Sequence, residues 1–190
     1  MCENISSSDE NIDNYVTKTN KIRYKTFTKI KKSTKKLQID DLYAKALNIL
    51  NACGRTRAQL FNSLCAYGAD PRMADDVLDE LEKLGLIDDV QYAKDYFEQA
   101  VYNKNFGPRR IKQSLYEKGI SNEIISEILC EYDYTMQLDI ARKVALKKLL
   151  SYKKLDYYKQ KQKLYSILAN KGFNYDVICE ITYSLLNEND

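Results

Sequence analysis

The chain has 190 residues, of which 44% are hydrophobic and 30% are charged, and its formal net charge is +3. This composition supports a folded core and excludes a chain that is disordered throughout. There is no histidine, which excludes Ser–His–Asp and Cys–His nucleophiles, histidine-ligated metals and imidazole acid–base catalysis. Six glycines and two prolines are too few for a turn-rich β-sandwich or barrel, so helices are expected.

Targeting signals and cysteines restrict the compartment. No apolar run approaches the roughly 18 residues of a membrane-spanning helix, and the N-terminus lacks the basic and then apolar layout of a secretory signal. The five cysteines, at positions 2, 53, 65, 130 and 179, form no CxxC pair. We expect a cytoplasmic protein with reduced and mostly buried cysteines, no zinc site, no cofactor and no membrane partner.

The first 38 residues differ in charge from the rest of the chain. Between Thr17 and Lys36 there are nine Lys or Arg residues and no Asp or Glu. Like charges in a run repel one another and seldom pack, so we interpret this segment as a flexible basic arm.

Beyond residue 40 the sequence repeats itself, and Gly68, Gly119 and Gly172 mark the repeat at intervals of 51 and 53 residues. Apolar residues lie four and eight positions before each glycine, and five and nine positions after it. This spacing is typical of two amphipathic helices joined at a tight turn. Glycine suits the turn because the residue just past a helix end often needs a positive φ.

Helix-start signals fall where the repeat requires them. Asp70-Pro71 is typical of an N-cap followed by a proline in the first turn. The equivalent positions of the other copies hold Ser121 and Asn174. Thr56 with Gln59 resembles a capping box at the start of a middle helix, and Gly107-Pro108 opens the next one.

A third helix precedes each pair, at about residues 41–53, 89–104 and 137–150. The sequence therefore predicts an all-α protein of three three-helix repeats, at residues 40–87, 88–134 and 135–188. Units of this size are near the lower limit for independent stability. We expect them to stack into an elongated array with a continuous hydrophobic seam.

Basic side chains gather in the second and third repeats. On a helix, Arg109, Lys112 and Tyr116 fall on one side. Two arginines in a first turn, Arg109 and Arg110, oppose the helix dipole at a cost of up to about 1 kcal/mol each if exposed. Such a cost indicates a use elsewhere. The alternative is that they pair with a nearby carboxylate, and for any single lysine a solvated helix face is the simpler interpretation.

The run Phe106-Gly107-Pro108-Arg109-Arg110-Ile111, followed by Leu115 and Lys118-Gly119-Ile120, resembles the signature of the RecX regulators of the RecA recombinase. Segments 56–60 and 77–89 are similar to the first repeat of that family, and the resemblance extends over about residues 42–186. It implies a curved array of tandem three-helix repeats without catalysis of its own. Members bind in the groove of the RecA–single-stranded DNA filament, block its extension and favour its disassembly. The third copy lacks the Pro-Arg-Arg opening, so a binding role there depends on lysines alone.

We therefore predict a non-enzymatic inhibitor of the RecA recombinase that modulates recombination and DNA repair, binds single-stranded DNA weakly and non-specifically, and has no small-molecule substrate. The candidate partner-binding or DNA-binding residues are Arg55, Arg57, Arg109, Arg110, Lys112, Tyr116, Lys147, Lys153, Lys154, Lys159 and Lys163. Two alternatives stay open: a helix-turn-helix DNA-binding protein that acts without a recombinase, and a protein-interaction solenoid with no DNA role.

Overall fold

A computed structural model of the chain describes residues 38–187, so the expected basic arm falls almost entirely outside the described range. Within that range there are nine α-helices and no strand, which confirms the all-α fold. The helices are α2 (Ile39–Ala52), α3 (Arg57–Tyr67), α4 (Pro71–Lys83), α5 (Asp89–Glu98), α6 (Pro108–Glu117), α7 (Asn122–Cys130), α8 (Tyr134–Tyr152), α9 (Tyr157–Lys171) and α10 (Tyr175–Asn187). A π-helical segment, η1 (Gln99–Asn103), directly continues α5.

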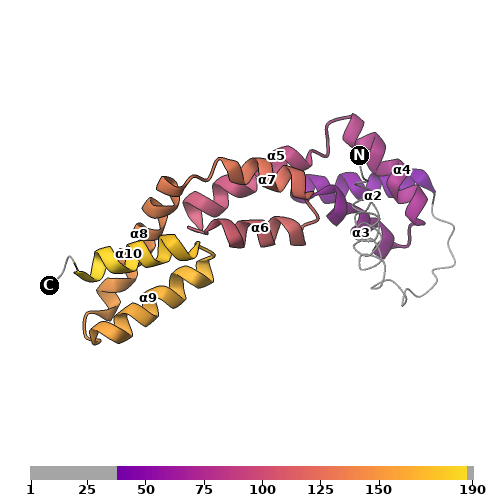
Figure 1. The fold of residues 1–190 in the computed structure, drawn as a ribbon. Coiled ribbons are helices and arrows are strands. Elements are labelled where there is room, and N and C mark those ends of the chain that lie inside the picture. Colours follow the sequence, from indigo (N-terminus) through magenta and orange to yellow (C-terminus); the bar gives the residue numbers. More distant parts are fainter. Residues whose placement is uncertain (1–37, 188–190) are drawn as a thin grey trace, which may run out of the picture.

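The helices pack in three consecutive triplets that form an elongated body (Figure 1). Helices α2, α3 and α4 contact one another, as do α8, α9 and α10, and α7 packs against both α5 and α6. The first triplet lies at one end of the body and the third at the other. This arrangement confirms the expected helical repeat.

The turns and helix starts lie where the sequence predicts them. Gly68, Gly119 and Gly172 have φ values of +112°, +84° and +87°, in the region that favours glycine. The predicted N-cap side chains that accept a backbone hydrogen bond from the following helix are those of Thr56, Asp70 and Ser121. Local signals therefore account for most of the helix boundaries.

The buried side chains form two hydrophobic clusters, so the expected continuous seam is wrong. One cluster lies within the first triplet, between Leu42 and Ile87. The other extends through the second and third triplets, from Ala93 to Leu186. A polar contact lies at the joint between them, where the buried Thr56 hydroxyl donates a hydrogen bond of 2.6 Å to the carbonyl of Lys118.

The cysteines are less buried than the sequence predicts. The four that the structure describes are free thiols, but only Cys65 is buried, while Cys53 and Cys130 are exposed. Burial raises the pKa of the Cys65 thiol, and the nearby charges of Asp75 and Asp70 raise it further.

Across residues 38–187, no helix is both long and apolar enough to cross a lipid bilayer.

Candidate nucleic-acid and partner interface

The Phe-Gly-Pro-Arg-Arg segment lies where the second triplet meets the third. The N–H of Gly107 donates to the carbonyl of Lys171 (2.8 Å), and the N–H of Arg109 donates to the carbonyl of Gly172 (3.0 Å). The start of α6 thus lies against the end of α9 (Figure 1). Gly107 has an ordinary φ of −81°, but a Cβ there would lie 2.4 Å from the carbonyl carbon of Gly172. Glycine is required for this close approach, not for a turn.

A chain of hydrogen bonds runs beside this joint. The hydroxyl of Tyr132 donates to the carbonyl of Phe106 (3.0 Å), and the Gln137 amide donates to the carbonyl of Tyr132 (3.1 Å). The Asn174 amide donates to the side-chain oxygen of Gln137 (3.4 Å), and Nε of Arg109 donates to that of Asn174 (3.3 Å). Burial raises the pKa of Tyr132, which keeps its hydroxyl a donor. This series of hydrogen bonds connects α6 with α10 across the joint.

The first joint uses equivalent positions of the repeat. Thr56 and Gly107 are the N-caps of the middle helices α3 and α6. Lys118 and Lys171 precede the turn glycines that follow α6 and α9. Thr56 contacts the carbonyl of Lys118 through its hydroxyl, whereas Gly107 contacts that of Lys171 through its backbone. Each of these middle helices therefore begins against the turn after the middle helix of the next triplet.

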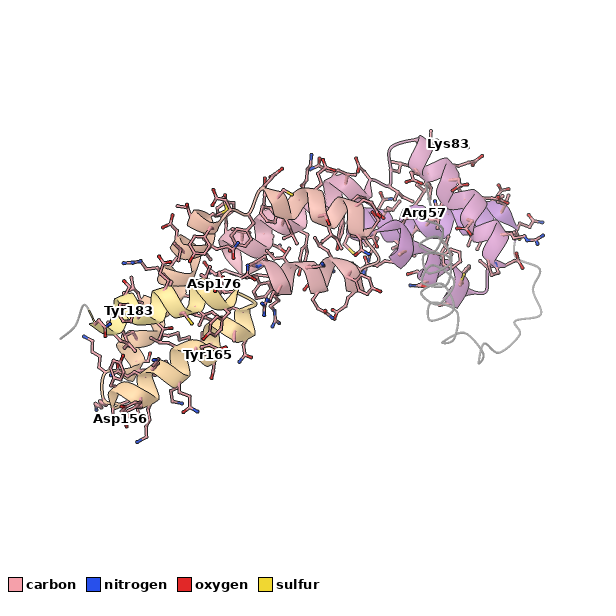
Figure 2. All side chains as sticks on the ribbon, viewed as in Figure 1. Arg57, Lys83, Asp156, Tyr165, Asp176 and Tyr183 are labelled. Carbon is pink, nitrogen blue, oxygen red and sulfur yellow. The ribbon has the colours of Figure 1, made fainter. Side chains whose placement is uncertain are left out.

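Arg57 lies in the first triplet (Figure 2), where carboxylates of the same triplet contact its side chain, and its role in partner or DNA binding stays a prediction. Its guanidinium forms ion pairs with three carboxylates of α4, those of Asp75 (3.3 Å), Asp79 (2.7 Å) and Glu82 (3.2 Å). Its backbone N–H donates to the carboxylate of Asp89 (2.8 Å). Burial raises the pKa of Asp89, and the hydrogen bond from Arg57 opposes that rise. With its charge neutralised, Arg57 does not join the interface that we propose below.

Arg110 packs against Phe106 and the end of α9. Its guanidinium carbon lies 4.6 Å from the centre of the Phe106 ring, and its Nη1 donates to the carbonyl of Asn170 (3.1 Å). The C-terminal end of a helix carries partial negative charge, which attracts an arginine. The arginine that opposes the dipole of α6 is thus attracted to the dipole of α9.

Most of the other predicted residues are exposed and widely separated. These are Arg55 before α3, Lys112 and Tyr116 on α6, Lys147 on α8, and Lys153 and Lys154 after it. Lys159 forms an ion pair of 2.8 Å with Asp156, the N-cap of α9. This pairing lowers the pKa of Asp156 and raises that of Lys159. Arg57 lies in the first triplet and Asp156 at the far end of the third (Figure 2), so the predicted residues do not converge on one site.

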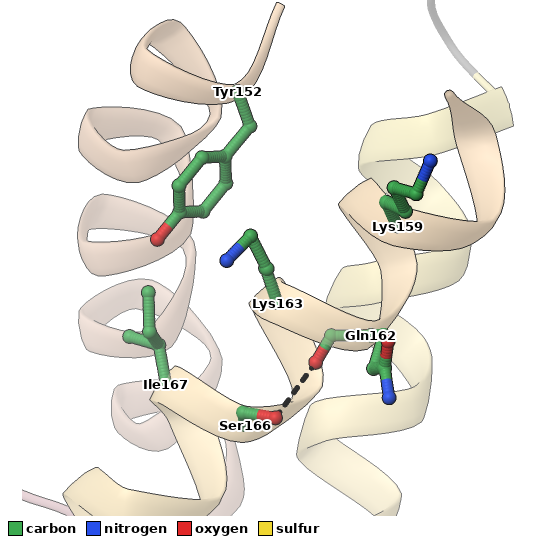
Figure 3. Close-up of a pocket in the computed structure, with 6 residues that line it drawn as sticks. All are labelled: Tyr152, Lys159, Gln162, Lys163, Ser166 and Ile167. Carbon is green, nitrogen blue, oxygen red and sulfur yellow. Dashed lines mark hydrogen bonds between the residues drawn. The ribbon is translucent and has the colours of Figure 1, made fainter. Parts of the chain in front are cut away.

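A hollow of about 430 Å³ between α8 and α9 contains Lys163. Its lining residues are Tyr152, Lys159, Gln162, Lys163, Ser166 and Ile167. The ammonium of Lys163 points toward the ring of Tyr152 (Figure 3), at 5.8 Å from the ring centre. The lining has two cations and no carboxylate, and since Lys159 is paired with Asp156 outside the lining, Lys163 is the cation that suits contact with an anion.

The candidate residues predicted from the sequence do not include three lysines beside the Phe-Gly-Pro-Arg-Arg segment. Lys171 lies 5.2 Å from the centre of the Phe106 ring, and Lys104 and Lys118 lie 5.1 and 5.4 Å from that of Tyr96. Lys118 and Lys171 share one register position, directly before a turn glycine, and this signal could have identified them. Burial lowers the pKa of Lys171, and nearby positive charges lower it further.

The chain is similar to known proteins over most of its length. Models of the second and third three-helix domains of RecX match residues 88–129 and 135–182. Regulatory protein RecX of Finegoldia magna is 33% identical over 176 residues, which cover 85% of this chain and 86% of the relative. That of Streptococcus uberis is 34% identical, and the match covers 72% of this chain but only 52% of the relative. The crystal structure of RecX from Lactobacillus salivarius is 30% identical with a TM-score of 0.71, covering 77% of this chain and 96% of that one.

Proposed function

Because this chain belongs to the RecX family of regulatory proteins, we propose that it regulates the RecA recombinase by binding the filament that RecA forms on single-stranded DNA. It blocks extension of the filament and promotes its disassembly, and thereby modulates recombination and DNA repair. It acts in the cytoplasm, by binding and without catalysis of its own.

One observation carries this proposal: the elongated body bears cations without carboxylate partners along its second and third triplets. Among the residues that the structure describes, Lys159 is the only lysine of α8 or α9 with a carboxylate within 4.0 Å. Cations spread along an extended body suit an extended polyanion. A body of this length that contacts DNA and protein subunits together would obstruct the addition of further subunits.

The acidic helix α4 supplies a second surface of opposite sign. Arg57 neutralises part of it, but Asp76 and Glu80 are exposed and have no ion pair within the described residues. A filament presents protein as well as DNA, so contact of α4 with a basic protein surface would complement contact of the lysines with phosphates.

The test is the growth and decay of RecA filaments on single-stranded DNA, with this chain added at equimolar amount to RecA. We expect slower extension and faster disassembly. No change in either rate would overturn the proposal.

Binding measurements without recombinase separate the two alternatives. Duplex binding with a sequence preference beyond about 10³-fold would favour a helix-turn-helix regulator. No DNA affinity even at low salt would favour a protein-interaction solenoid. Weak binding that falls with salt is the result expected for a filament regulator.

A further inference from the structure

Four cations of the second and third triplets form a connected series that we name the cationic row: Lys118, Lys104, Lys171 and Arg110. Lys118 and Lys104 share one aromatic ring, since their ammonium nitrogens lie 5.4 and 5.1 Å from the centre of the Tyr96 ring. Lys118 also lies 5.8 Å from the ring of Tyr92. Attraction between a cation and the face of a ring holds each ammonium near its ring.

The row continues across the joint between the second and third triplets. The ammonium of Lys171 donates a hydrogen bond of 2.6 Å to the carbonyl of Lys104. Lys171 and Arg110 then share the ring of Phe106, at 5.2 and 4.6 Å from its centre. The row thus joins residues that follow η1 with residues of α6 and α9.

The charges of the row are not neutralised within residues 38–187. No carboxylate in that range lies within 4.0 Å of any of the four cations. A lysine ammonium has three donors and an arginine guanidinium has five. In the described part of the chain, Lys171 and Arg110 each use one of these donors, on the carbonyls of Lys104 and Asn170. The remaining donors suit an anion.

The electrostatics of Lys171 support the same conclusion. Burial lowers the pKa of its ammonium, and the positive charges of Arg110 and Lys148 lower it further. A group whose charged form is disfavoured by burial and by like charges is stabilised when a negative charge binds beside it.

We propose that the cationic row binds consecutive phosphates of one DNA strand across the joint between the second and third triplets. The four cations are linked in sequence through the Tyr96 ring, the Lys104 carbonyl and the Phe106 ring, with no single group that contacts all four, which suits an extended backbone better than a small anion. The rings restrict the cations before binding, so less side-chain entropy is lost on contact. The inference deepens the proposed function and rests on it only in taking DNA as part of the target.

The experiment measures binding of fluorescein-labelled oligo(dT) by anisotropy over a series of salt concentrations, without recombinase. For single strands, log K falls with log salt by about 0.7 for each phosphate that the protein neutralises. The double variant Lys104→Met, Lys118→Met is therefore expected to lower the magnitude of that slope by about 1.4 and to weaken binding at low salt. Circular dichroism melts of each variant establish that it is folded.

Three further variants separate the effect of charge from those of position and of general perturbation. Lys45→Met removes a cation that lies 5.3 Å from the Tyr67 ring in the first triplet, outside the row, and is expected to leave the slope unchanged. Tyr96→Leu removes the shared ring but no charge, so affinity is expected to fall while the slope stays. Lys104→Arg with Lys118→Arg keeps both charges and is expected to keep the slope.

Three results would each overturn the inference: an unchanged slope in the double lysine variant, an equal loss of slope in Lys45→Met, or a loss of slope confined to the double variant Lys153→Met, Lys154→Met.

The filament assay on the same proteins separates this inference from the proposed function. If the unmodified chain leaves filaments unaffected while the double lysine variant shows the lower salt slope expected, the proposed function fails and the inference stands. If the unmodified chain regulates filaments and the row variants bind DNA unchanged, the inference alone fails.

Discussion

At Gly107 the lack of a side chain matters for contact and not for backbone conformation. A Cβ would lie 2.4 Å from both the carbonyl carbon of Gly172 and the nitrogen of Phe173. Backbone atoms cannot rotate away as a side chain can, so the joint itself must shift. We expect Gly107→Ala to lower the free energy of unfolding by about 2–3 kcal/mol, measured by urea denaturation.

Two other glycines provide matched controls for this variant. At Gly54 a Cβ would meet its nearest atom at 4.0 Å, so Gly54→Ala is expected to stay within about 0.5 kcal/mol of the native chain. At Gly85 nothing lies within 4 Å but φ is +68°, so Gly85→Ala isolates backbone strain, at about 1–2 kcal/mol. A Gly107→Ala protein as stable as Gly54→Ala would contradict the close approach of α6 and α9.

Lys171 is expected to make stability depend on pH in the alkaline range. Its folded-state pKa is lowered from the ordinary 10.5 by burial and by the charges of Arg110 and Lys148. Between the lowered and the ordinary value the unfolded chain binds more protons, so the stability of the native chain rises with pH there. Relative to Lys171→Met, the native chain should therefore gain stability as pH rises toward 10.5.

The measurement is the difference in the free energy of unfolding between native and variant chains over a series of pH values. Lys161→Met removes an exposed charge from the same helix and controls for the general loss of one positive charge. Identical pH profiles for Lys171→Met and Lys161→Met would contradict the prediction.

The roles of single residues were only partly predictable from sequence. Helical spacing places Arg109 and Lys112 on one side of α6, and the exposure of both agrees with that. The partners of Arg57 and Arg110 come from α4 and from the end of α9, far away along the chain. Spacing along one helix carries no information about such partners, because they depend on how the helices pack.

At the level of the element, Thr56 serves both as the N-cap of α3 and as the contact between the first two triplets. Its oxygen accepts from the N–H of Gln59, and its hydroxyl donates to the carbonyl of Lys118. Thr56→Val keeps the shape of the side chain but removes both hydrogen bonds, and it leaves the carbonyl of Lys118 without this donor. We expect a loss of about 2–3 kcal/mol, with hydrogen exchange faster in α2, α3 and α4 than in the later helices.

Two substitutions test whether the joint contact contributes beyond the cap. Thr56→Ser keeps both bonds and is expected to keep most of the stability. Asp70→Ala removes an exposed cap that makes no contact between triplets in the described structure, so a loss of only about 1 kcal/mol is expected. Equal losses in Thr56→Val and Asp70→Ala would contradict a role for Thr56 in the joint.

Helix boundaries were predictable where they depend on local chemistry. N-cap side chains and turn glycines act within a few residues, so α4 begins at Pro71 after Asp70, as expected. The helix expected at residues 89–104 differs, since its last turn is the π-helical segment η1. There the N–H of Phe106 reaches back to the carbonyl of Ala100, and Asn105 has a φ of +51°. These features adjoin the joint with the third triplet, which is formed by residues distant in sequence.

For the whole molecule, the repeat was predictable but the division of the core was not. All three copies have the same apolar spacing around their glycines. That spacing establishes that each triplet has an apolar interior, and it does not establish which interiors meet. The first joint is polar because the N-cap there is Thr56, whose hydroxyl contacts a backbone carbonyl, while the glycine at the second joint lets two backbones touch.

The two cores predict different behaviour for two truncated chains. Residues 88–190 retain the whole of the second cluster, so this fragment is expected to keep its helical signal and to melt cooperatively, within about 5 °C of the later transition of the full chain. Residues 38–134 lose the third triplet and expose apolar side chains of the second, including those near Tyr132. This fragment is expected to lose the cooperative transition of its second triplet.

Circular dichroism melts of the two fragments and the full chain test this division of the core. The first triplet alone has only a small core and is near the lower size limit for independent folding, so its helices are expected to melt first in the full chain. A single transition shared by all three triplets, or a 38–134 fragment that melts as cooperatively as 88–190, would mean that the polar joint couples its neighbours as strongly as the shared apolar core does.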